Sequence, residues 1–515
     1  MDLTKKLKKP VKLLWFAMLV SLPITSFPLI SESLGGVVLV SPLAMIPMLL
    51  VVLLGVFPAL LQKEPLPRLT KPIFLFAFLA FISACMAFLL PIFPYKGQSI
   101  LDRELRAGIT LMIGLGFYIS VIVLARNKAD ILSGMRAIYI GLFLVIVWSA
   151  VQTWTILDQV PTIPHWISTI HRWFSIHDPY PHRVTGLAYE PSWFGNQLVI
   201  IYLPLLIGSI ITGESIFQKR IGWVSIELLL GVSALLILIM TKSRISLLSF
   251  SAIVACLFAV FVYRFLKKRF KQIASDSPLN IVRLTRLLQN VLLITILIAL
   301  LTGLGVVFLW GVSQLDDRMT DLFEMGSLVT ELRYFYPNDV VFAVGHRLTL
   351  AERFIYWATA NRIFSAYPLL GVGPGNAGFF FQDFLPVYGH QLVEIQNVLT
   401  QPMYGFPNPK SLWFRILAEN GIVGFISLMV WLILLASTAR ALIRSRDRFD
   451  RFIGISGAIC LIAQIFEGFS LDTYALPQLW IMLGLLTAWG TKRLRDFSSQ
   501  SPVANEPLLG SNTRE

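Results

Sequence analysis

The sequence predicts an all-α integral membrane protein, and three observations support this prediction. The 515 residues are 56% hydrophobic and only 14% charged, whereas a soluble domain carries about a quarter charged residues. The mean hydropathy is +0.72, which is typical of a chain that crosses the bilayer many times. Residues 314–420 form one long interval rich in charged side chains, with apolar segments on both sides. We therefore expect a helical membrane bundle that carries one long polar loop.

Apolar segments of spanning length divide the chain. A membrane helix needs roughly 20 apolar residues, and about twelve segments qualify: 11–30, 36–62, 72–94, 108–125, 137–157, 194–212, 223–241, 245–265, 291–313, 421–441, 452–469 and 474–490. The expected units are 1–313 with spans one to nine, the loop 314–420, 421–490 with the remaining spans, and a tail at 491–515. The N-terminal MDLTKKLKKP resembles the start of a signal peptide, but no small-residue cleavage site follows it, so we expect a retained first span.

Lysine and arginine alternate between the loops, which predicts the orientation of the chain. Basic clusters lie at 5–9, 63–71, 126–136, 219–220, 267–286, 444–451 and 492–495. By the positive-inside rule these loops face the cytoplasm. The loops that then face the periplasm are 31–35, 95–107, 158–193, 242–244, 314–420 and 470–473. Topology thereby explains the net charge of +14, so we expect the lipid bilayer as a partner and no nucleic acid.

Cysteine and histidine form no pattern typical of a metal site. The three cysteines each lie in an apolar run, as small core residues do. All six histidines fall in the long outward loops 158–193 and 314–420. Imidazole is disfavoured in lipid, which explains this placement without a metal, and the spacing of His171, His177 and His182 matches no standard zinc motif. We expect no metal, no cofactor and no disulfide.

Two outward-facing stretches carry charges at the membrane surface. HRVTGLAYEPSWFGNQL places Arg183 and Glu190 before an apolar span, with Pro191 positioned to open the helix. TKSRIS leaves a short hairpin between two apolar helices, and this hairpin ends at Arg244. A charge at this depth is costly without a partner, so Arg244 is a candidate functional residue. The alternatives are an interfacial ion pair between Arg183 and Glu190, and an Arg244 side chain that reaches the lipid headgroups.

The long loop contains a predicted amphipathic helix and a tight turn. GHRLTLAERFIYWATANRIF has helical periodicity and carries Arg347 and Arg353, whose guanidinium groups suit phosphate oxygens. LLGVGPGN follows as a turn, but it lacks the Lys-Ser/Thr pair of a nucleotide-binding loop and is an incomplete phosphate cradle. Together with Arg183 and Arg244, these arginines are expected to converge on the outer face, where they suit a lipid diphosphate.

Short motifs recur in a fixed order from roughly residue 180 to 485. They are RVTG with EPSWF, KSR, RFIYW, PLLGVGPGN, AENGIVG, and a late proline and tryptophan at Pro477 and Trp480. No single motif is specific, but the ordered set resembles the O-antigen ligase and O-antigen polymerase superfamily of bacterial membrane glycosyltransferases. The expected topology also resembles that of this superfamily.

The resemblance implies a GT-C-like, all-helical glycosyltransferase of the bacterial inner membrane, with its active side in the periplasm. The donor would be a glycan on undecaprenyl diphosphate, and the acceptor a second glycan or a glycolipid. Transfer would invert the anomeric carbon, without a nucleotide sugar. The residues that would bind the diphosphate or the glycan are Arg183, Glu190, Arg244, Arg347 and Arg353. The resemblance also suggests a chain-length regulator or a flippase as a further partner.

One position departs from the ligase pattern. Ligases carry a histidine at the position that holds Lys410 here, nine residues before Glu419. This departure favours a polymerase, which extends a lipid-linked glycan, over a ligase, which transfers the glycan to lipid A-core. The candidate catalytic residues are Lys410, as a base or as a charged binding group, and Glu419 and His390, as groups that position the acceptor. A transporter is the alternative from another class, with Glu227 and Glu467 as candidate intramembrane charges.

Overall fold

The described residues are almost entirely helical. A computed structural model describes residues 3–33, 40–62, 65–157, 163–217, 220–221, 224–275, 303 and 350–499. Within these ranges the only sheet is the antiparallel pair β1 (Arg220–Ile221) and β2 (Val224–Ser225). The architecture agrees with the all-α class that composition predicts.

The N-terminal part of the bundle runs from α1 to α12. Its helical elements are α1 (Leu3–Val20), α2 (Pro28–Ser33), α3 (Met45–Val51), η1 (Val52–Val56), α4 (Phe57–Leu61), η2 (Arg68–Thr70), α5 (Lys71–Ala87), α6 (Ile100–Leu124), α7 (Lys128–Leu157), α8 (His165–His171), α9 (Pro191–Gln197), η3 (Leu198–Tyr202), α10 (Leu203–Thr212), α11 (Ile226–Met240) and α12 (Arg244–Ser275). The run from α3 to α4 is continuous through the π-helical turn η1, and the run from α9 to α10 is continuous through the π-helical turn η3.

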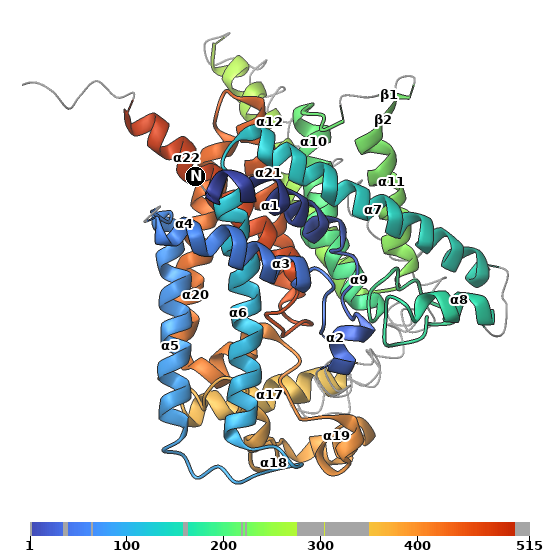
Figure 1. Ribbon diagram of the computed structural model, residues 1–515, viewed down its shortest axis with the longest axis vertical. Helices are drawn as coiled ribbons and strands as arrows, with labels where there is room; N and C mark the ends of the chain where they lie inside the picture. The colour runs from blue at the N-terminus through green and yellow to red at the C-terminus, as the bar shows by residue number, and fades with distance from the viewer. Residues whose placement is uncertain are drawn as a thin grey trace, which may run out of the picture.

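The C-terminal part begins in the long loop and ends with three long helices. Its elements are α17 (Ala351–Ala366), η4 (Ala377–Phe380), α18 (Phe381–Phe384), η5 (Val387–Gln391), α19 (Val393–Thr400), η6 (Pro402–Tyr404), α20 (Leu412–Ile443), α21 (Arg448–Glu467) and α22 (Pro477–Ser499). In Figure 1, α17, α18 and α19 lie together at one end of α5, α6 and α20.

Seven of the described helices are long and apolar enough to cross a membrane. They are Arg68–Ala87, Ile100–Leu124, Lys128–Ile156, Pro191–Thr212, Arg244–Lys268, Leu412–Ile443 and Arg448–Glu467. Met45–Leu61 and Ile226–Met240 are apolar but shorter. Apart from Gly303, the predicted span at 291–313 lies outside the described residues. The expected total of about twelve spans therefore stays a prediction.

The first predicted span, 11–30, is not a single helix. α1 ends at Val20, and the chain turns before α2 begins at Pro28. Pro23 lies in this turn; proline lacks a backbone N–H and its ring clashes with the preceding helical turn, so it disfavours a continuous helix. Thr25 is fully buried in the same stretch. The chain after α1 therefore passes into the protein interior.

The loops predicted to share one side of the membrane meet at one end of the bundle. Lys128, at the start of α7, lies 2.5 Å from Glu214, just after α10. Arg493, near the end of α22, lies 2.8 Å from Asp450 in the first turn of α21. Lys128 Nζ also lies 4.6 Å from the centre of the Phe449 ring in α21, so the alternation that lysine and arginine predict holds for these four helices. The compartment that each end faces stays a prediction.

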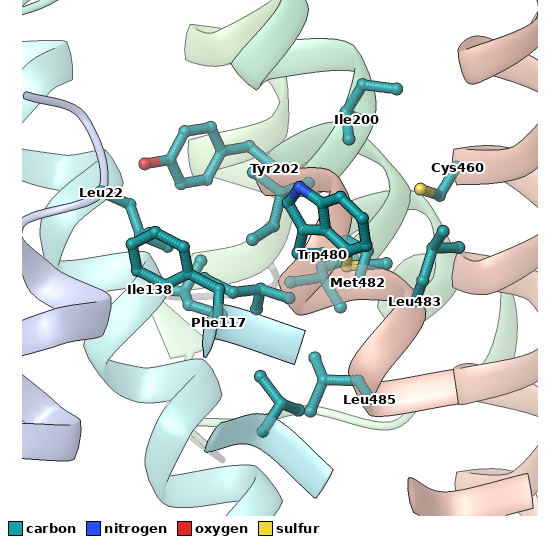
Figure 2. Close-up of a cluster of buried hydrophobic side chains, with 14 of the residues drawn as sticks. Leu22, Phe117, Ile138, Ile200, Tyr202, Cys460, Trp480, Met482, Leu483 and Leu485 are labelled. Carbon is teal, nitrogen blue, oxygen red and sulfur yellow. The ribbon is translucent and has the colours of Figure 1, made fainter. Parts of the chain in front are cut away.

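A large apolar core holds the helices together. Figure 2 shows part of it, where Phe117, Ile138, Tyr202 and Trp480 come from α6, α7, η3 and α22. Each of these side chains is at most 4% exposed. Because interiors are close-packed and transmit small shifts, this core fixes the positions of the helix ends where the polar residues lie.

A helix and a turn after it are present where the sequence predicts an amphipathic helix and a tight turn, although residues 345–349 of the predicted helix lie outside the described residues. α17 ends at Ala366, just before the glycine-rich turn. In that turn the Val372 N–H donates to the Ala418 carbonyl at 3.0 Å, and the Gly373 N–H donates to the Glu419 carbonyl at 3.0 Å. The turn is thus paired through its backbone with the first part of α20.

A glycine divides α20 into two parts. The helix begins at Leu412, inside the interval predicted as loop, and departs from helical geometry at Gly421, where φ is 62° and ψ is −168°. Beyond this break the Ile422 N–H donates to the Pro368 carbonyl at 2.8 Å. The break falls beside the predicted domain boundary at 420, and it separates a short first part of α20 from a longer apolar part.

Substitution of Gly421 tests whether this break is structurally required. In Gly421→Ala the new Cβ would overlap with the Leu369 carbonyl, in addition to the strain of a left-handed backbone. Gly405 also has a left-handed backbone, with φ +76°, but no described atom lies within 4 Å of an added Cβ. Gly405→Ala should therefore cost only about 1–2 kcal/mol, and Gly421→Ala clearly more. Thermal unfolding of the purified protein in detergent measures both, and an equal loss of Tm would contradict the expectation.

Candidate functional site

The loop that precedes α9 is fastened to the turn between α11 and α12. Arg183 Nε donates to the Thr241 carbonyl at 3.0 Å, and Arg183 Nη2 donates to the Lys242 carbonyl at 3.3 Å. α12 begins two residues later, at Arg244. Two of the predicted arginines, Arg183 and Arg244, therefore lie on segments that the structure brings together.

Glu190 lies where α9 begins. It is the N-cap residue, with φ −145° and ψ 160°, and Pro191 is the first helical residue, as predicted. The Ser192 hydroxyl donates a hydrogen bond to the Glu190 carboxylate. Burial raises the pKa of the Tyr180 phenol, and the negative charge of Glu190 raises this pKa further; burial also raises the pKa of Tyr189. Glu190 is thus next to phenols that stay protonated and can donate hydrogen bonds.

Arg353 connects α17 to two other segments. Its Nη1 donates to the Lys410 carbonyl at 3.0 Å and to the Ser470 carbonyl at 3.2 Å. Lys410 has a left-handed backbone, with φ 52°, and its N–H donates to Asn408 Oδ1 at 3.0 Å. The Lys410 Nζ lies 5.9 Å from the centre of the Tyr356 ring, which is within cation–π distance. The predicted residues Arg353 and Lys410 are therefore brought together.

A buried carboxylate joins the helices on which these residues lie. Glu467, the last residue of α21, is 1% exposed. Its oxygens accept hydrogen bonds from Asn196 Nδ2 of α9 at 2.9 Å and from Ser249 Oγ of α12 at 3.2 Å. Gln478 of α22 donates to Asn196 Oδ1 at 2.6 Å. Four helices thus meet at one polar cluster within the apolar core.

The residues after Glu467 continue the connection to the long loop. The Gly468 carbonyl accepts a hydrogen bond from the Ser411 hydroxyl at 3.0 Å. The Ser470 carbonyl accepts one from Arg353 at 3.2 Å. The end of α21 is therefore a common anchor, through Glu467 for α9 and α12, and through its next residues for the Arg353 and Lys410 region.

Glu419, one of the predicted catalytic residues, is held in an ion pair. Its carboxylate lies 2.9 Å from Arg415 Nε, and its side chain is 4% exposed. Arg415 also donates to the Asp472 carbonyl at 2.6 Å. Removal of one partner from a buried pair costs about 3–5 kcal/mol, so a structural role accounts for this glutamate. Its catalytic role stays a prediction.

The described contacts do not bring His390 to the other candidate catalytic residues. His390 is exposed on η5, and its carbonyl accepts a hydrogen bond from Gln396 Nε2 at 2.9 Å. In the part of the chain that the structure describes, no hydrogen bond or ion pair joins its ring to Lys410 or Glu419. Arg347 lies outside the described residues. The roles of His390 and Arg347 stay predictions.

The glycine-rich turn packs against α20 instead of presenting a phosphate cradle. The N–H groups of Val372 and Gly373 are bound to carbonyls of α20, as described above. A Cβ added at Gly371 would lie 2.5 Å from the Ala418 carbonyl oxygen, so glycine permits this close approach. At Gly375 an added Cβ would lie 2.6 Å from a backbone oxygen of α6. The motif is therefore explained by backbone packing between three segments.

The histidines of the first long loop have packing partners. Among the described residues, no group of three or more His, Cys, Asp and Glu side chains is placed to hold a metal ion. His171 is buried beside Trp148, whose Nε1 donates to His171 Nδ1 at 3.3 Å, and burial lowers the pKa of His171 to about 4. His177 stacks on Tyr180, with ring centres 4.9 Å apart. Aromatic packing therefore accounts for these two histidines.

Several residues of this region have no functional role predicted from the sequence. The ion pair of Arg415 is predictable from local sequence, because arginine and glutamate four residues apart pair on one helix face. A partner for Glu467 is also predictable, since an ionisable residue in an apolar helix needs one. The sequence, however, links this residue only to the transporter alternative. Asn196 and Ser249 had no local signal, because their partner lies 271 and 218 residues away in sequence.

Fold and site together describe a mostly helical membrane protein in which Arg183 is bound to the turn before α12, and Arg353 joins Lys410 to the segment after α21. Residues 228–429 match the family model described as O-Antigen ligase. This match confirms the resemblance to the O-antigen ligase and O-antigen polymerase superfamily, and it indicates a function of that type in polysaccharide assembly. No curated protein matches the chain.

A double-mutant cycle tests the polar cluster around Glu467. Glu467→Ala and Asn196→Ala should each lower the free energy of unfolding by about 1–3 kcal/mol, because each leaves a buried polar group unpaired. A cavity left by the shortened side chain would lower the free energy of unfolding further. The double variant should lose less than the sum, because the second substitution removes the group that the first leaves unpaired. A coupling of about 0.5–3 kcal/mol is expected, measured by thermal unfolding in detergent.

The control cycle pairs Glu467→Ala with Ser427→Ala. Ser427 also lies in a buried helix contact, donating to the Pro72 carbonyl at 3.1 Å, but it shares no described partner with Glu467. These two effects should add within about 0.5 kcal/mol. Additive effects in the Asn196 cycle would show that the cluster does not act as a unit.

Proposed function

We propose that this protein transfers a glycan from an undecaprenyl-diphosphate carrier to an acceptor sugar during surface polysaccharide assembly, and that it does so as a polymerase. The reaction would be that of an inverting, lipid-diphosphate-dependent glycosyltransferase on the periplasmic side of the inner membrane. The observation that carries the proposal is the placement of Arg183, Arg353 and Lys410 beside the ends of α12 and α21, in a chain whose residues 228–429 match the O-antigen ligase family.

The proposed role of the arginines is to bind the diphosphate leaving group. A diphosphate gains negative charge as the glycosidic bond breaks, and donors fixed in advance stabilise that charge without reorganisation. Arg183 and Arg353 are both held by backbone carbonyls, and Arg244 begins the helix next to Arg183. One charge-assisted hydrogen bond contributes about 1.5–3 kcal/mol, so a few such contacts suffice to accelerate departure of the carrier strongly.

The proposed role of Lys410 is to bind phosphate or sugar oxygens as a charged ammonium. Its Nζ lies over the Tyr356 ring, and a diphosphate bound nearby would hold the ammonium protonated. The alternative is a neutral lysine that acts as the base for the acceptor hydroxyl, which requires a pKa several units below about 10.4. In either case the acceptor hydroxyl attacks the anomeric carbon from the face opposite the diphosphate.

The chemistry at position 410 favours polymerase over ligase. Lysine stands where ligases carry a histidine, so the ligase base is absent from its usual position. A ligase that transfers the finished glycan to lipid A-core is the second candidate, supported by the description of the matching family.

The carboxylates that motivated the transporter alternative have structural partners. Glu227 accepts hydrogen bonds from the Ile216 N–H and the Ser215 hydroxyl, both at 2.8 Å. Glu467 is bound by Asn196 and Ser249. Since these contacts explain both glutamates, neither favours transport over transfer.

Deletion of the gene tests the proposed function. A polymerase predicts surface polysaccharide with a single repeat unit in the deletion strain, because ligation continues without chain extension. A ligase predicts full-length glycan that stays on the lipid carrier. Gel banding of extracted polysaccharide and analysis of the carrier-linked pool distinguish the two, with complementation by the wild-type gene as control. Unchanged banding and an unchanged carrier pool would contradict both.

Substitution of Lys410 distinguishes its two candidate roles. Arginine stays protonated at all relevant pH values, so the binding role predicts substantial transfer by Lys410→Arg with an unchanged pH profile. The base role predicts near-complete loss in the same variant. Transfer by purified protein is measured against pH, with thermal unfolding as a control for folding. Wild-type activity in Lys410→Ala would exclude both roles.

A further inference from the structure

At the end of the bundle where the Lys128 and Arg493 contacts lie, two cavities meet at one arginine. The larger cavity, of about 620 Å³, lies between α1, α4 and the junction of α6 with α7. The smaller, of about 350 Å³, lies between α4, α6 and α22. Arg126, Ala59 and Val123 line both cavities, so the two are parts of one site.

The charges around this site are mostly positive. Among the described residues, its lining includes the cations Lys12, Arg126 and Lys492 and one acidic residue, Asp130. Asp130 already accepts a hydrogen bond from Asn127 Nδ2 at 2.7 Å and lies 3.8 Å from Lys12 Nζ. The balance of charge therefore favours an anionic ligand.

Two buried donors in the lining have no hydrogen-bond partner among the described residues. One is Nε1 of Trp15, a residue that is only 6% exposed and lines the larger cavity. The other is Oγ1 of Thr491, a residue that lines the smaller cavity. A buried donor left unpaired costs about 1–3 kcal/mol. Each of the two cavities therefore has one unpaired donor besides its cations, which suits a ligand with several acceptor oxygens.

The surroundings of the site are apolar, which distinguishes a lipid from a soluble anion. Leu54 lines the larger cavity, and Leu60 and Leu66 line the smaller one. On α4 the neighbouring Phe57 and Leu61 are 56% and 67% exposed, so they offer apolar surface to acyl chains in the membrane. A phosphate beside Arg126 would lie directly next to this surface.

We propose that this site binds an anionic phospholipid from the leaflet at this end of the bundle. Arg126, shared by the two cavities, would bind the headgroup phosphate, and α4 would contact the acyl chains. Basic pockets between membrane helices on the cytoplasmic side are suited to anionic headgroups, and sequence assigns this end to the cytoplasm. The bound lipid would join α1, α4, α6 and α22, which surround the site.

Lipid titration of the full-length protein in detergent, followed by native mass spectrometry, tests the proposal. Phosphatidylglycerol should bind in preference to phosphatidylcholine. Arg126→Gln should weaken phosphatidylglycerol binding by roughly tenfold, and Trp15→Phe, which removes the indole N–H together with part of the ring volume, should weaken it less. Arg446→Gln is the matched control, because it removes the same charge from an exposed residue at the same end, outside both cavities.

A second variant controls for the possibility that Arg126→Gln weakens binding by disturbing the fold. Arg126 Nε also donates to the Val123 carbonyl at 2.7 Å, so Arg126→Lys, which keeps the charge, is measured as well and should retain most of the preference. Equal binding of the two lipids by the wild-type protein would overturn the proposal, as would equal effects of Arg126→Gln and Arg446→Gln. Displacement of phosphatidylglycerol by inorganic phosphate at similar concentration would also overturn it, since the site would then select a soluble anion.

Discussion

The buried hydrogen bonds of Glu467 are the constraint on which one end of the bundle depends. A carboxylate in an apolar core is strongly unfavourable unless donors reach its oxygens, and here Asn196 of α9 and Ser249 of α12 supply them. Satisfying these bonds fixes the ends of α9, α12 and α21 relative to one another. Gly195 permits the approach, because a Cβ there would lie 2.5 Å from Ser246 Oγ. The motifs EPSWFGN and KSRIS are thus two sides of one helix contact.

A second constraint joins the long loop to the same region through the backbone. The glycine-rich turn donates two N–H groups to carbonyls of α20, and Gly421 then redirects α20 beside Leu369. Neither segment can keep this geometry without the other, so the motifs PLLGVGPGN and AENGIVG form one structural unit. Ser411, just before α20, binds the carbonyl after Glu467. The two constraints therefore meet at the end of α21, and the residues between them have little freedom to move.

Local signals predicted the elements of this region, whereas its contacts depend on distant residues. Pro191 at the start of α9 and the end of α17 before a glycine-rich turn are set by nearby sequence, and the structure has both. The first predicted span is wrong as a single helix, because the apolar run outweighed the two prolines, Pro23 and Pro28, that interrupt it, and the chain turns between α1 and α2. The partner of Glu467 could not be predicted, because its donors lie 271 and 218 residues away. The ion pair of Glu419 with Arg415, one helical turn before it, follows from local spacing on the helix.

Arginines that are already bound to backbone carbonyls remain suited to an anionic substrate. A guanidinium carries five N–H donors in a planar fork, so one side chain can bind a carbonyl and a phosphate oxygen together. Lysine, a point charge on a flexible stem, lacks this geometry. Because Arg183 and Arg353 are held by carbonyls of the α11–α12 turn and the segment after α21, they lose less conformational entropy on binding. The proposed diphosphate site would therefore derive its rigidity from the buried contacts of Glu467, and the same contacts that join the helices would position the groups that act on the substrate.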